Sequence, residues 1–487
     1  MSTKIFRSIL IVFTAVMALT SFANDNLDRG IAAIKAGDYV KALDILKSVS
    51  KNSYEANLYY GIALFKTGSL AEAEKSLKAA IREDEEGAAA YSSLGEIYSQ
   101  QKKYSDAAAQ FELSKKYLPL SKTKDQLDKE EIVLIISVLK AESENFIAEM
   151  KVDKAISSLT QAKIYDDKNP LLYVGLGDAY LARGAFDIAK SNYDEALKLK
   201  PNYAPALYGI GDISFKRKKY SEALENFIKS ADADNNFAPA YFRKGVIFYL
   251  IDKFDDAIEA FTRYDVLVPG SPRGKTYLAK SYYGKREFDK ALGILEEVLA
   301  KDPNYSEANK YVAYIKIEQK KYDEAEQYFN KVKPEDLNAE DYTKWSIIYK
   351  DKKEFSKAYQ HLDKAVSLDS NDENTYFEYG KTLFADTNYA RANVMFLKSI
   401  ELGIINLGAY VFSGVCYYYT KEFDKGVEIL LKCTEKDPNI KSAWLWLGNN
   451  YINLNKNAEA CAAYKKYLEF EPNDQFALDQ VARICGK

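Results

Sequence analysis

Histidine is almost missing from this chain of 487 residues, which has a single copy, His361. A histidine pair at metal-ligand spacing is therefore impossible. The phosphate-binding patterns Gly-x-Gly-x-x-Gly and Gly-x4-Gly-Lys-Ser/Thr are absent, and so is the nucleophile pattern Gly-x-Ser-x-Gly. His361 stands in "YQHLDKAV" at a position that usually faces outward, so we expect a solvated or partly packed side chain rather than a general base. The sequence predicts no enzyme, no catalytic residues, no metal and no cofactor.

Proline and glycine are also scarce, with 11 and 23 copies, which argues against long flexible linkers. The chain lacks the concentrated basic face that nucleic acids require, because its net charge is -3 and both signs are mixed in every segment. Apolar residues make up 47% of the chain, and 39 tyrosines and 24 phenylalanines are too many for a disordered protein. Since 487 residues exceed one compact core, we expect several domains or an elongated repeat.

Residues 1–23 have the features of an export signal. Two basic residues precede an apolar run from Ile9 to Leu19, which is shorter than the ~20 residues needed to cross a bilayer. Ser21-Phe22-Ala23 then supplies small residues where a signal peptidase reads the chain. We predict a cleaved signal peptide and a periplasmic or secreted mature chain that starts near Asn24 and does not insert into a membrane. The alternative is an uncleaved N-terminal membrane anchor.

One small residue recurs at a nearly constant interval along the chain. It is the alanine of an aromatic-x-x-Ala phrase, as in Phe186–Ala189 and Tyr220–Ala223. From Ala155 onward the interval is 34 residues with one step of 33, whereas the step from Ala107 to Ala155 is 34 plus 14 and indicates an insertion. The position is occupied by Ala42, Ala73, Ala107, Ala155, Ala189, Ala223, Ala257, Ala291, Ala325, Ala358, Ala392, Gly426 and Ala460. Chance does not produce this period, so the chain is a repeat protein.

Each period contains two stretches with helical spacing. The segment Tyr173–Tyr180 has apolar residues at i, i+3, i+4 and i+7, and a second such stripe begins at Phe186. Gly184 breaks the run between them, and Pro201 stops the second helix because it lacks a backbone donor. Each period therefore predicts two antiparallel helices joined by a tight turn, with small residues such as Gly177 at their closest approach.

These residues resemble the tetratricopeptide repeat. The family's pattern is matched by Tyr173, Leu176, Gly177, Tyr180, Ala189, Tyr193, Ala196 and Pro201. It returns near the C-terminus as Trp444, Leu447, Gly448, Tyr451, Ala460, Tyr464 and Pro472. Single copies depart from it at Gly426, Ala279 and Ser370. The resemblance covers about thirteen copies and implies an all-α, right-handed superhelical α-solenoid of helix-turn-helix repeats.

The repeats predict how the chain is divided. We expect an N-terminal array at residues 24–119 and a main array at residues 132–474, separated by the charged stretch 120–131. That stretch could be a surface loop or an added helical turn. The main array opens with the apolar run Ile132–Leu139, which we assign to the core rather than to partner docking. Residues 475–487 are predicted to form a capping helix whose outer face tolerates water.

The four cysteines all fall in the last 72 residues, at Cys416, Cys433, Cys461 and Cys485. Export makes a disulfide permissible. Counting outward from the turn near Pro472 places Cys461 opposite residue 484, whereas Cys416 and Cys433 are out of register by roughly 12 Å. We predict a Cys461–Cys485 bond that holds the cap; the alternative is four buried thiols.

The resemblance also implies where a partner binds. In this family the first helices of successive repeats line a concave groove that holds a peptide or protein segment. The matching positions are Tyr208, Asp212, Phe215, Phe242, Tyr249, Arg273, Lys280, Tyr283, Tyr314, Phe377, Phe384, Tyr418 and Tyr419. Aromatic side chains there would supply contact area at little entropic cost. The alternative is that these rings pack between neighbouring repeats.

We therefore expect a non-enzymatic scaffold or adaptor that binds a protein or peptide in an aromatic-lined groove. The cluster of Lys, Arg and Asn with which chaperone-tail binders of this family hold a carboxylate is not reproduced around Arg273 and Lys280. The alternative function is a structural subunit of a cell-envelope assembly, such as a secretion, pilus or polysaccharide-export machine. Such a subunit would bind through its edges and convex face.

Overall fold

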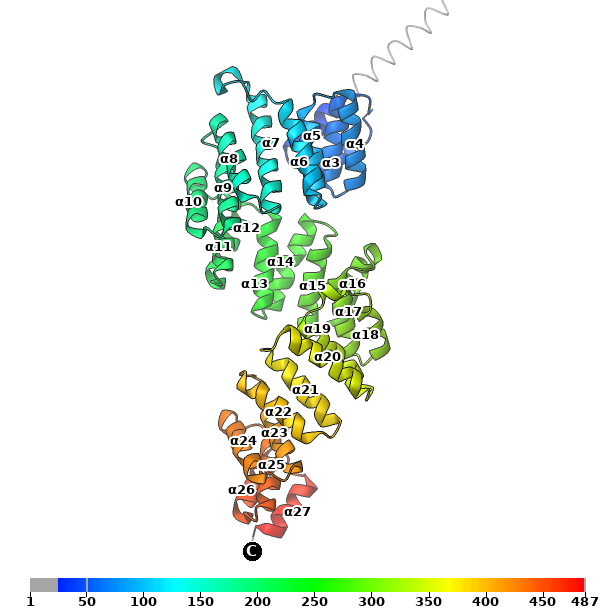
Figure 1. Ribbon diagram of the computed structural model, residues 1–487, viewed down its shortest axis with the longest axis vertical. Coiled ribbons are helices and arrows are strands. Elements are labelled where there is room, and N and C mark those ends of the chain that lie inside the picture. Colours follow the sequence, from blue (N-terminus) through cyan, green and yellow to red (C-terminus); the bar gives the residue numbers. More distant parts are fainter. Residues whose placement is uncertain (1–24, 50, 486–487) are drawn as a thin grey trace, which may run out of the picture. The chain divides into compact units, whose positions relative to one another are not determined.

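The computed structural model describes residues 25–49 and 51–485, and all regular structure within them is helical (Figure 1). Consecutive helices pair as helix-turn-helix units, which confirms the predicted all-α repeat fold. The predicted signal peptide lies outside the described residues. The chain divides into two compact units, Met1–Ile247 and Phe248–Lys487, and the boundary falls within α13 (Ala238–Leu250). No helix of the described residues is both long enough and apolar enough to span a bilayer.

Unit 1 begins with a helical segment at residues 25–35 and continues as paired helices. Their bounds are α2 (Tyr39–Leu46), α3 (Tyr54–Lys66), α4 (Leu70–Glu83), α5 (Ala88–Gln100), α6 (Tyr104–Lys116), α7 (Lys129–Ala148), α8 (Val152–Tyr165), α9 (Pro170–Arg183), α10 (Phe186–Leu199), α11 (Ala204–Lys216) and α12 (Tyr220–Ala233). The short helix η1 (Lys124–Gln126) precedes α7. From α3 onward each odd-numbered helix is the first of its pair.

Unit 2 continues the same arrangement after α13. Its helices are α14 (Phe254–Leu267), α15 (Pro272–Gly284), α16 (Phe288–Lys301), α17 (Ser306–Glu318), α18 (Tyr322–Phe329), α19 (Ala339–Asp351), α20 (Phe355–Leu368), α21 (Glu373–Ala385), α22 (Tyr389–Glu401), α23 (Gly408–Tyr419), α24 (Phe423–Lys436), α25 (Lys441–Asn453), α26 (Asn457–Phe470) and α27 (Gln475–Ile484). The short helix η2 (Pro334–Asp336) precedes α19.

Paired helices approach closely because a small residue on each meets the other helix. The twelve alanines at the recurrent position, from Ala42 to Ala460, have 0% exposed surface. On the first helices, a Cβ added at Gly211 would stand 2.7 Å from the Phe227 ring, and one added at Gly448 would stand 2.6 Å from the Tyr464 ring. A larger residue at these positions would therefore force the two helices apart.

The departure from alanine at Gly426 has a local cause. Asn450, which is fully buried on α25, places its side-chain oxygen where a Cβ on Gly426 would stand. The Asn450 Nδ2 donates to the Trp446 carbonyl at 2.8 Å, which holds the amide in this position. Glycine therefore makes room for the buried Asn450 amide.

The tight turn between paired helices places one residue in the left-handed region. Gly184 adopts it with φ +80°, which confirms the turn predicted there. Gly37 and Gly68 occupy the equivalent position with φ +78° and +90°. In the remaining repeats that residue carries a side chain, with φ between 57° and 64°, at Lys102, Met150, Lys218, Asp252, Arg286, Lys320, Lys353, Thr387, Lys421 and Asn455. The repeat thus imposes this conformation even where no glycine is present.

The charged stretch 120–131 forms both a loop and an added helical turn. It contains η1, and its last residues begin α7, which Asp128 caps by accepting from the Glu131 N–H at 2.8 Å. Most of the following apolar run is core, as predicted, since Ile135 and Leu139 are fully buried. Val133 alone among its large apolar residues is more than half exposed, at 59%.

The core continues across this stretch. The helix α7 packs on both α5 and α6, and Ala88 and Leu118 share one buried cluster with Ile135. Packing is therefore continuous from the helices before the charged stretch to those after it. The boundary between the two compact units lies at residue 247, and the predicted division into two arrays stays a prediction.

The last described helix, α27, packs on α26 through Ala477 and Ile484. Its other face leaves Phe476 and Leu478 at 50% and 40% exposed, which is more apolar than a cap needs to be. Cys461 and Cys485 are joined by a disulfide, with their Cα atoms 5.4 Å apart. Cys416 is a buried free thiol whose pKa is raised to about 12 by burial, and Cys433 is also buried and free.

Candidate functional site

In unit 2 the first helices of successive pairs form one continuous surface, which we call the first-helix face. It consists of α15, α17, α19, α21, α23 and α25. Most neighbours in this series pack directly. Phenylalanines connect α21 to α23, since the Phe412 ring lies 6.1 Å from the Phe377 ring and 5.3 Å from the Phe384 ring. The residues predicted to bind a partner can be judged against this face and its counterpart in unit 1.

Four predicted groove residues are buried. Phe242, Lys280, Tyr314 and Phe377 expose only 4–8% of their surface. These four side chains therefore offer little surface to a partner, and their predicted role in binding stays a prediction. The rings of Phe242, Tyr314 and Phe377 instead fit the alternative, in which they pack between neighbouring repeats. Burial of a large aromatic side chain is favourable. Phe377 nonetheless lines the wall of a cavity described below.

Lys280 occupies an aromatic cage formed by the protein itself. Its Nζ lies 4.7 Å from the centroids of both the Tyr277 and Tyr311 rings and 5.9 Å from that of Tyr249. Lys280 also forms an ion pair with Glu307 at 3.2 Å. An internal cation therefore already takes the place that a ligand cation could occupy among these tyrosines.

Three other predicted residues contact Arg243, which is not among the predicted positions. The Arg243 Nε lies 3.0 Å from the Asp212 carboxylate and donates to the Tyr208 hydroxyl at 3.3 Å. The same guanidinium lies 5.0 Å from the Phe215 ring centroid. Tyr208, Asp212 and Phe215 are half-buried, and they form one polar cluster on the first-helix face of unit 1.

A row of carboxylates follows the same face of unit 1. Glu96, Glu144, Asp178 and Asp212 lie on α5, α7, α9 and α11, each directly after the small residue of its first helix. Desolvation by the surrounding protein raises the pKa of Asp178 to about 7, although part of the side-chain surface remains exposed to solvent. Tyr193 donates to this carboxylate at 2.6 Å, which partly offsets the rise. The shared position within the repeat was a signal that could have identified this row.

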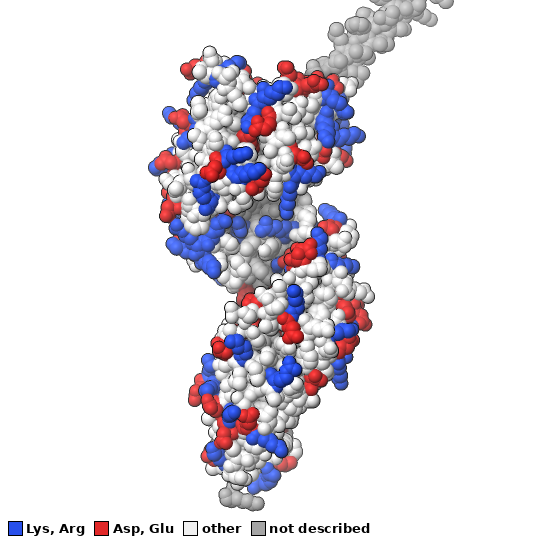
Figure 2. Space-filling view, in the orientation of Figure 1, with Lys and Arg blue, Asp and Glu red and all other residues white. Residues whose placement is uncertain are grey.

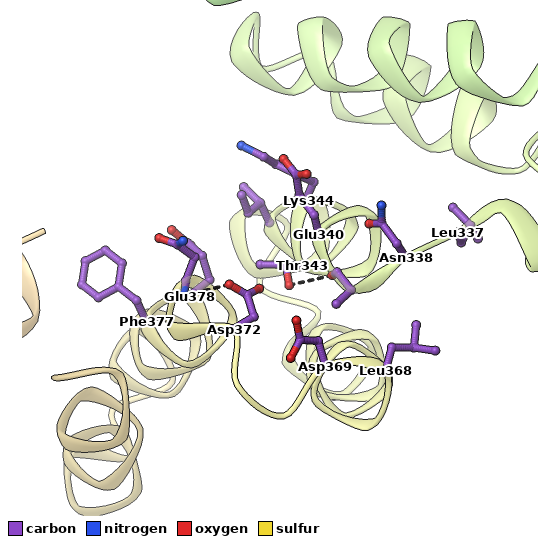
Figure 3. A pocket seen from close by; sticks show the side chains of 13 residues that line it. Leu337, Asn338, Glu340, Thr343, Lys344, Leu368, Asp369, Asp372, Phe377 and Glu378 are labelled. Atoms are coloured by element: carbon purple, nitrogen blue, oxygen red, sulfur yellow. Dashed lines mark hydrogen bonds between the residues drawn. The ribbon is translucent and has the colours of Figure 1, made fainter. Parts of the chain in front are cut away.

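The first-helix face of unit 2 has a cavity of about 940 Å³ between α19 and α21, which we call the acidic cavity (Figure 3). Its lining comes from the two helices and from the residues that precede each of them. These residues are Leu337, Asn338, Ala339, Glu340, Thr343, Lys344, Ile347, Leu368, Asp369, Asp372, Asn374, Phe377 and Glu378. Carboxylates therefore outnumber ammonium groups four to one in the lining.

The carboxylates of the acidic cavity are held in different ways. Asp369 accepts the backbone N–H of Asn371 at 2.9 Å in the turn between α20 and α21, and Asp372 accepts that of Asn374 at 3.1 Å in the first turn of α21. These bonds fix the positions of both carboxylates. Glu378 pairs with Lys381 at 2.7 Å, while its other oxygen is buried without a hydrogen bond. Glu340 is exposed, but desolvation by the neighbouring protein raises its pKa. Among the described contacts, Glu340 has no ion pair shorter than 4 Å.

A second cavity of about 500 Å³ lies farther along the same face, between α23 and α25, and we call it the apolar cavity. It is lined by Phe384, Gly408, Val411, Phe412, Val415, Ile440, Ser442 and Trp446. Ser442 is the only side chain with a hydrogen-bonding oxygen in this lining, beside the indole of Trp446. The two cavities adjoin at the contact between Phe377 and Phe412.

The remaining predicted residues have varied surroundings. Arg273 is exposed, and Tyr283 is half-buried against Tyr311, with ring centroids 5.6 Å apart. Tyr249 donates to or accepts from the Tyr311 hydroxyl at 3.3 Å. Tyr419 stacks on Tyr389 at 4.3 Å while keeping 48% of its surface exposed. These residues do not line either cavity.

His361 is half-buried, within the range expected of a solvated or partly packed side chain. Its ring lies 4.9 Å from Trp345 and 5.0 Å from Tyr349, and burial lowers its pKa. Within the residues that the structure describes, no group of histidine, cysteine and carboxylate side chains is arranged to hold a metal ion. Both signs of charge are interspersed over the visible surface of each unit (Figure 2).

Models of the tetratricopeptide repeat match four stretches of the chain. They cover residues 33–94, 174–239, 282–344 and 442–474. The chain therefore carries tetratricopeptide repeats, in both units.

Among curated proteins, the chain is 25% identical over 205 residues to Superkiller complex protein 3 of Homo sapiens, covering 40% of this chain and 13% of that protein. It is 24% identical over 164 residues to Hsp70-Hsp90 organizing protein 1 of Glycine max, covering 34% of this chain and 27% of that protein. The chain thus spans only a small part of these relatives.

Among solved structures, the APC/C hetero-tetramer Cut9-Hcn1 is 14% identical with a TM-score of 0.47, covering 93% of this chain and 95% of that one. Yeast Tom70 is 16% identical with a TM-score of 0.36, covering 82% and 97%. Both TM-scores are below 0.5, so the fold is assigned from this chain's own helices.

Proposed function

We propose that this chain, which carries tetratricopeptide repeats, is a non-enzymatic scaffold that binds a protein segment on the first-helix face of unit 2. One observation supports this proposal most directly. Two adjoining cavities, of about 940 and 500 Å³, open on that face, and both are lined chiefly by side chains of first helices. A surface with both polar and apolar cavities suits a polypeptide better than a small apolar ligand.

Site-specific photo-crosslinking in cells that naturally make the protein tests the proposal. A photo-reactive amino acid replaces Lys344, which is half-buried in the acidic cavity, and in a matched variant it replaces Glu296, which is exposed on the second helix α16. We expect a discrete protein adduct from position 344 and none from position 296. Adducts that are absent at 344, or equal at the two positions, would contradict the proposal.

The second candidate is a structural subunit of an envelope assembly, which would bind through the second helices and the edges. Exposed apolar side chains on second helices favour it: Ile164 on α8 is 71% exposed, and Val266 on α14 is 63% exposed. A photo-reactive amino acid in place of Val266 distinguishes the two functions. The envelope role requires an adduct from position 266, whereas the scaffold role requires one from position 344.

Export to the periplasm or the medium belongs to the same proposal, and it rests on the composition of residues 1–23. Mass spectrometry of the N-terminal peptide from fractionated cells tests it. We expect a mature N-terminus near Asn24 in the exported fraction. An intact Met1 peptide in the membrane fraction would favour the uncleaved anchor.

A further inference from the structure

The two cavities of unit 2 differ in chemistry although they share one face. The acidic cavity contains four carboxylates and one ammonium group, whereas the apolar cavity is lined by phenylalanine, valine, isoleucine and tryptophan. Lys350 and Lys381 partly neutralise Glu378, so the unpaired negative charge resides mainly on Glu340, Asp369 and Asp372. This leaves a negative cavity directly beside an apolar one.

Charge complementarity identifies an occupant for this pair of cavities. A lysine or arginine side chain would find carboxylates in the acidic cavity while its methylene stem lies along Ile347, Leu368 and Phe377. A large apolar side chain on the same segment would displace water from the cavity around Phe412 and Trp446. The contact between Phe377 and Phe412 makes the two cavities a continuous track.

We propose that the first-helix face of unit 2 recognises an extended partner segment in which basic residues are followed, or preceded, by large apolar residues. This inference rests on the proposed function and specifies the partner's chemistry. The centres of the two cavities are two helix-to-helix steps apart, on the order of 20 Å, although the walls of the cavities meet at Phe377 and Phe412. An extended chain covers that distance in about six residues. Among the described residues, these carboxylates form no group that could hold a metal ion.

Fluorescence anisotropy with short synthetic peptides tests this inference on the full chain. The probe peptide carries Lys-Lys and Phe-Phe separated by about six small polar residues. In one comparison peptide the lysines become glutamates, and in another the phenylalanines become serines. We expect binding of the probe that weakens with added salt, and about tenfold weaker binding of each comparison peptide.

Paired protein variants locate the binding. Glu340→Gln with Asp369→Asn removes charge from the acidic cavity, and we expect about tenfold weaker binding of the probe. The matched control, Glu296→Gln with Asp424→Asn, removes the same charge from exposed positions on the second helices α16 and α24, and binding should not change. Equal binding by the two double variants would overturn the inference.

Reversing the charge of both the cavity and the peptide distinguishes lost binding from poor folding of a variant. In Glu340→Lys with Asp369→Lys, the glutamate peptide should bind better than it binds the wild type, a gain that unfolding cannot produce. Failure of this exchange, together with adducts from position 344, would reject the basic-apolar partner and leave the scaffold function standing. Failure of both experiments would reject both.

Discussion

At Ala223 the side chain is one methyl group with 0% exposed surface, set between the two helices of a pair. The same is true of eleven other alanines at this position, which makes it the most uniform feature of the chain. Residue size at this point determines how closely each pair of helices can approach. The large partners opposite the first-helix glycines, such as Phe227 and Tyr464, fill the space that remains.

Ala223→Leu should therefore destabilise the protein by about 1–3 kcal/mol, because three additional carbons must enter a closed helix contact. Denaturant unfolding followed by circular dichroism measures the change. The neighbouring Ser221→Leu is the control, since Ser221 is exposed, and its effect should stay within about 0.5 kcal/mol. A neutral result for Ala223→Leu would count against the helix contact described here.

The second residue-scale prediction concerns Asp178, whose pKa is raised to about 7 by crowding. In the unfolded chain an aspartate titrates near pH ~4, so between about pH 4 and pH 7 the folded state holds the extra proton. Stability should therefore fall as pH rises through that window. Asp178→Asn removes this loss of stability. The difference in Tm between the variant and the wild type should therefore increase from about pH 4 to pH 7 and be constant above pH 7. If the Tm of the wild type and that of Asp178→Asn changed with pH in the same way, the raised pKa of Asp178 would be contradicted.

At the scale of elements, the turns between paired helices explain why most repeats tolerate a side chain in the left-handed region. Thr387 has φ 57° there, and a β-branched residue is poorly suited to that conformation. Gly184 occupies the equivalent position, and no atom lies within 4 Å of a Cβ added to it. Backbone strain alone should therefore distinguish glycine from other residues at this site.

Thr387→Gly should stabilise the protein by about 1 kcal/mol by relieving this strain, and Gly184→Ala should destabilise it by about the same amount. Thermal unfolding of the two variants measures both effects. Opposite signs are expected because the backbone conformation is the same and only the side chain differs. Two changes of the same sign would show that contacts outside the turn dominate.

At the scale of the whole molecule, two units of repeats are each built from stacked helix pairs, and a disulfide secures the last described helix. The Cys461–Cys485 bond closes a loop with a sequence separation of 24 residues. In the chain-entropy description such a bond contributes roughly 3 kcal/mol. In a repeat array the effect should be local, because each helix pair contacts mainly its neighbours.

Cys461→Ser with Cys485→Ser should therefore loosen α27 without unfolding the rest of unit 2. Hydrogen exchange should show faster exchange of the α27 amides and unchanged exchange in α15 and α17. Digestion of the oxidised protein without reductant should release the two cysteines in one linked peptide. A linked peptide containing Cys416 and Cys433 would contradict the structure, in which both are buried free thiols.

The repeat fold could be predicted from the sequence because its cause is local. Small residues returning every 34 positions, helical apolar spacing and a turn-forming Gly184 all act within one helix pair. The chain itself therefore determined the pairing of helices and the position of Gly177 against Tyr193. The candidate site was less predictable. Phe242 and Tyr314 were assigned to a groove, but sequence position cannot tell an inward-facing ring from one packed between neighbours.

Only the tertiary structure decided which first-helix residues are available to a partner. Burial of Phe242 and Tyr314, the cage around Lys280 and the two adjoining cavities all depend on side chains from several repeats meeting in space. Such contacts depend on how each pair is rotated against the next, and the size of residues in both pairs sets that rotation. The sequence by itself determined the helix pair, and packing between pairs determined the surface.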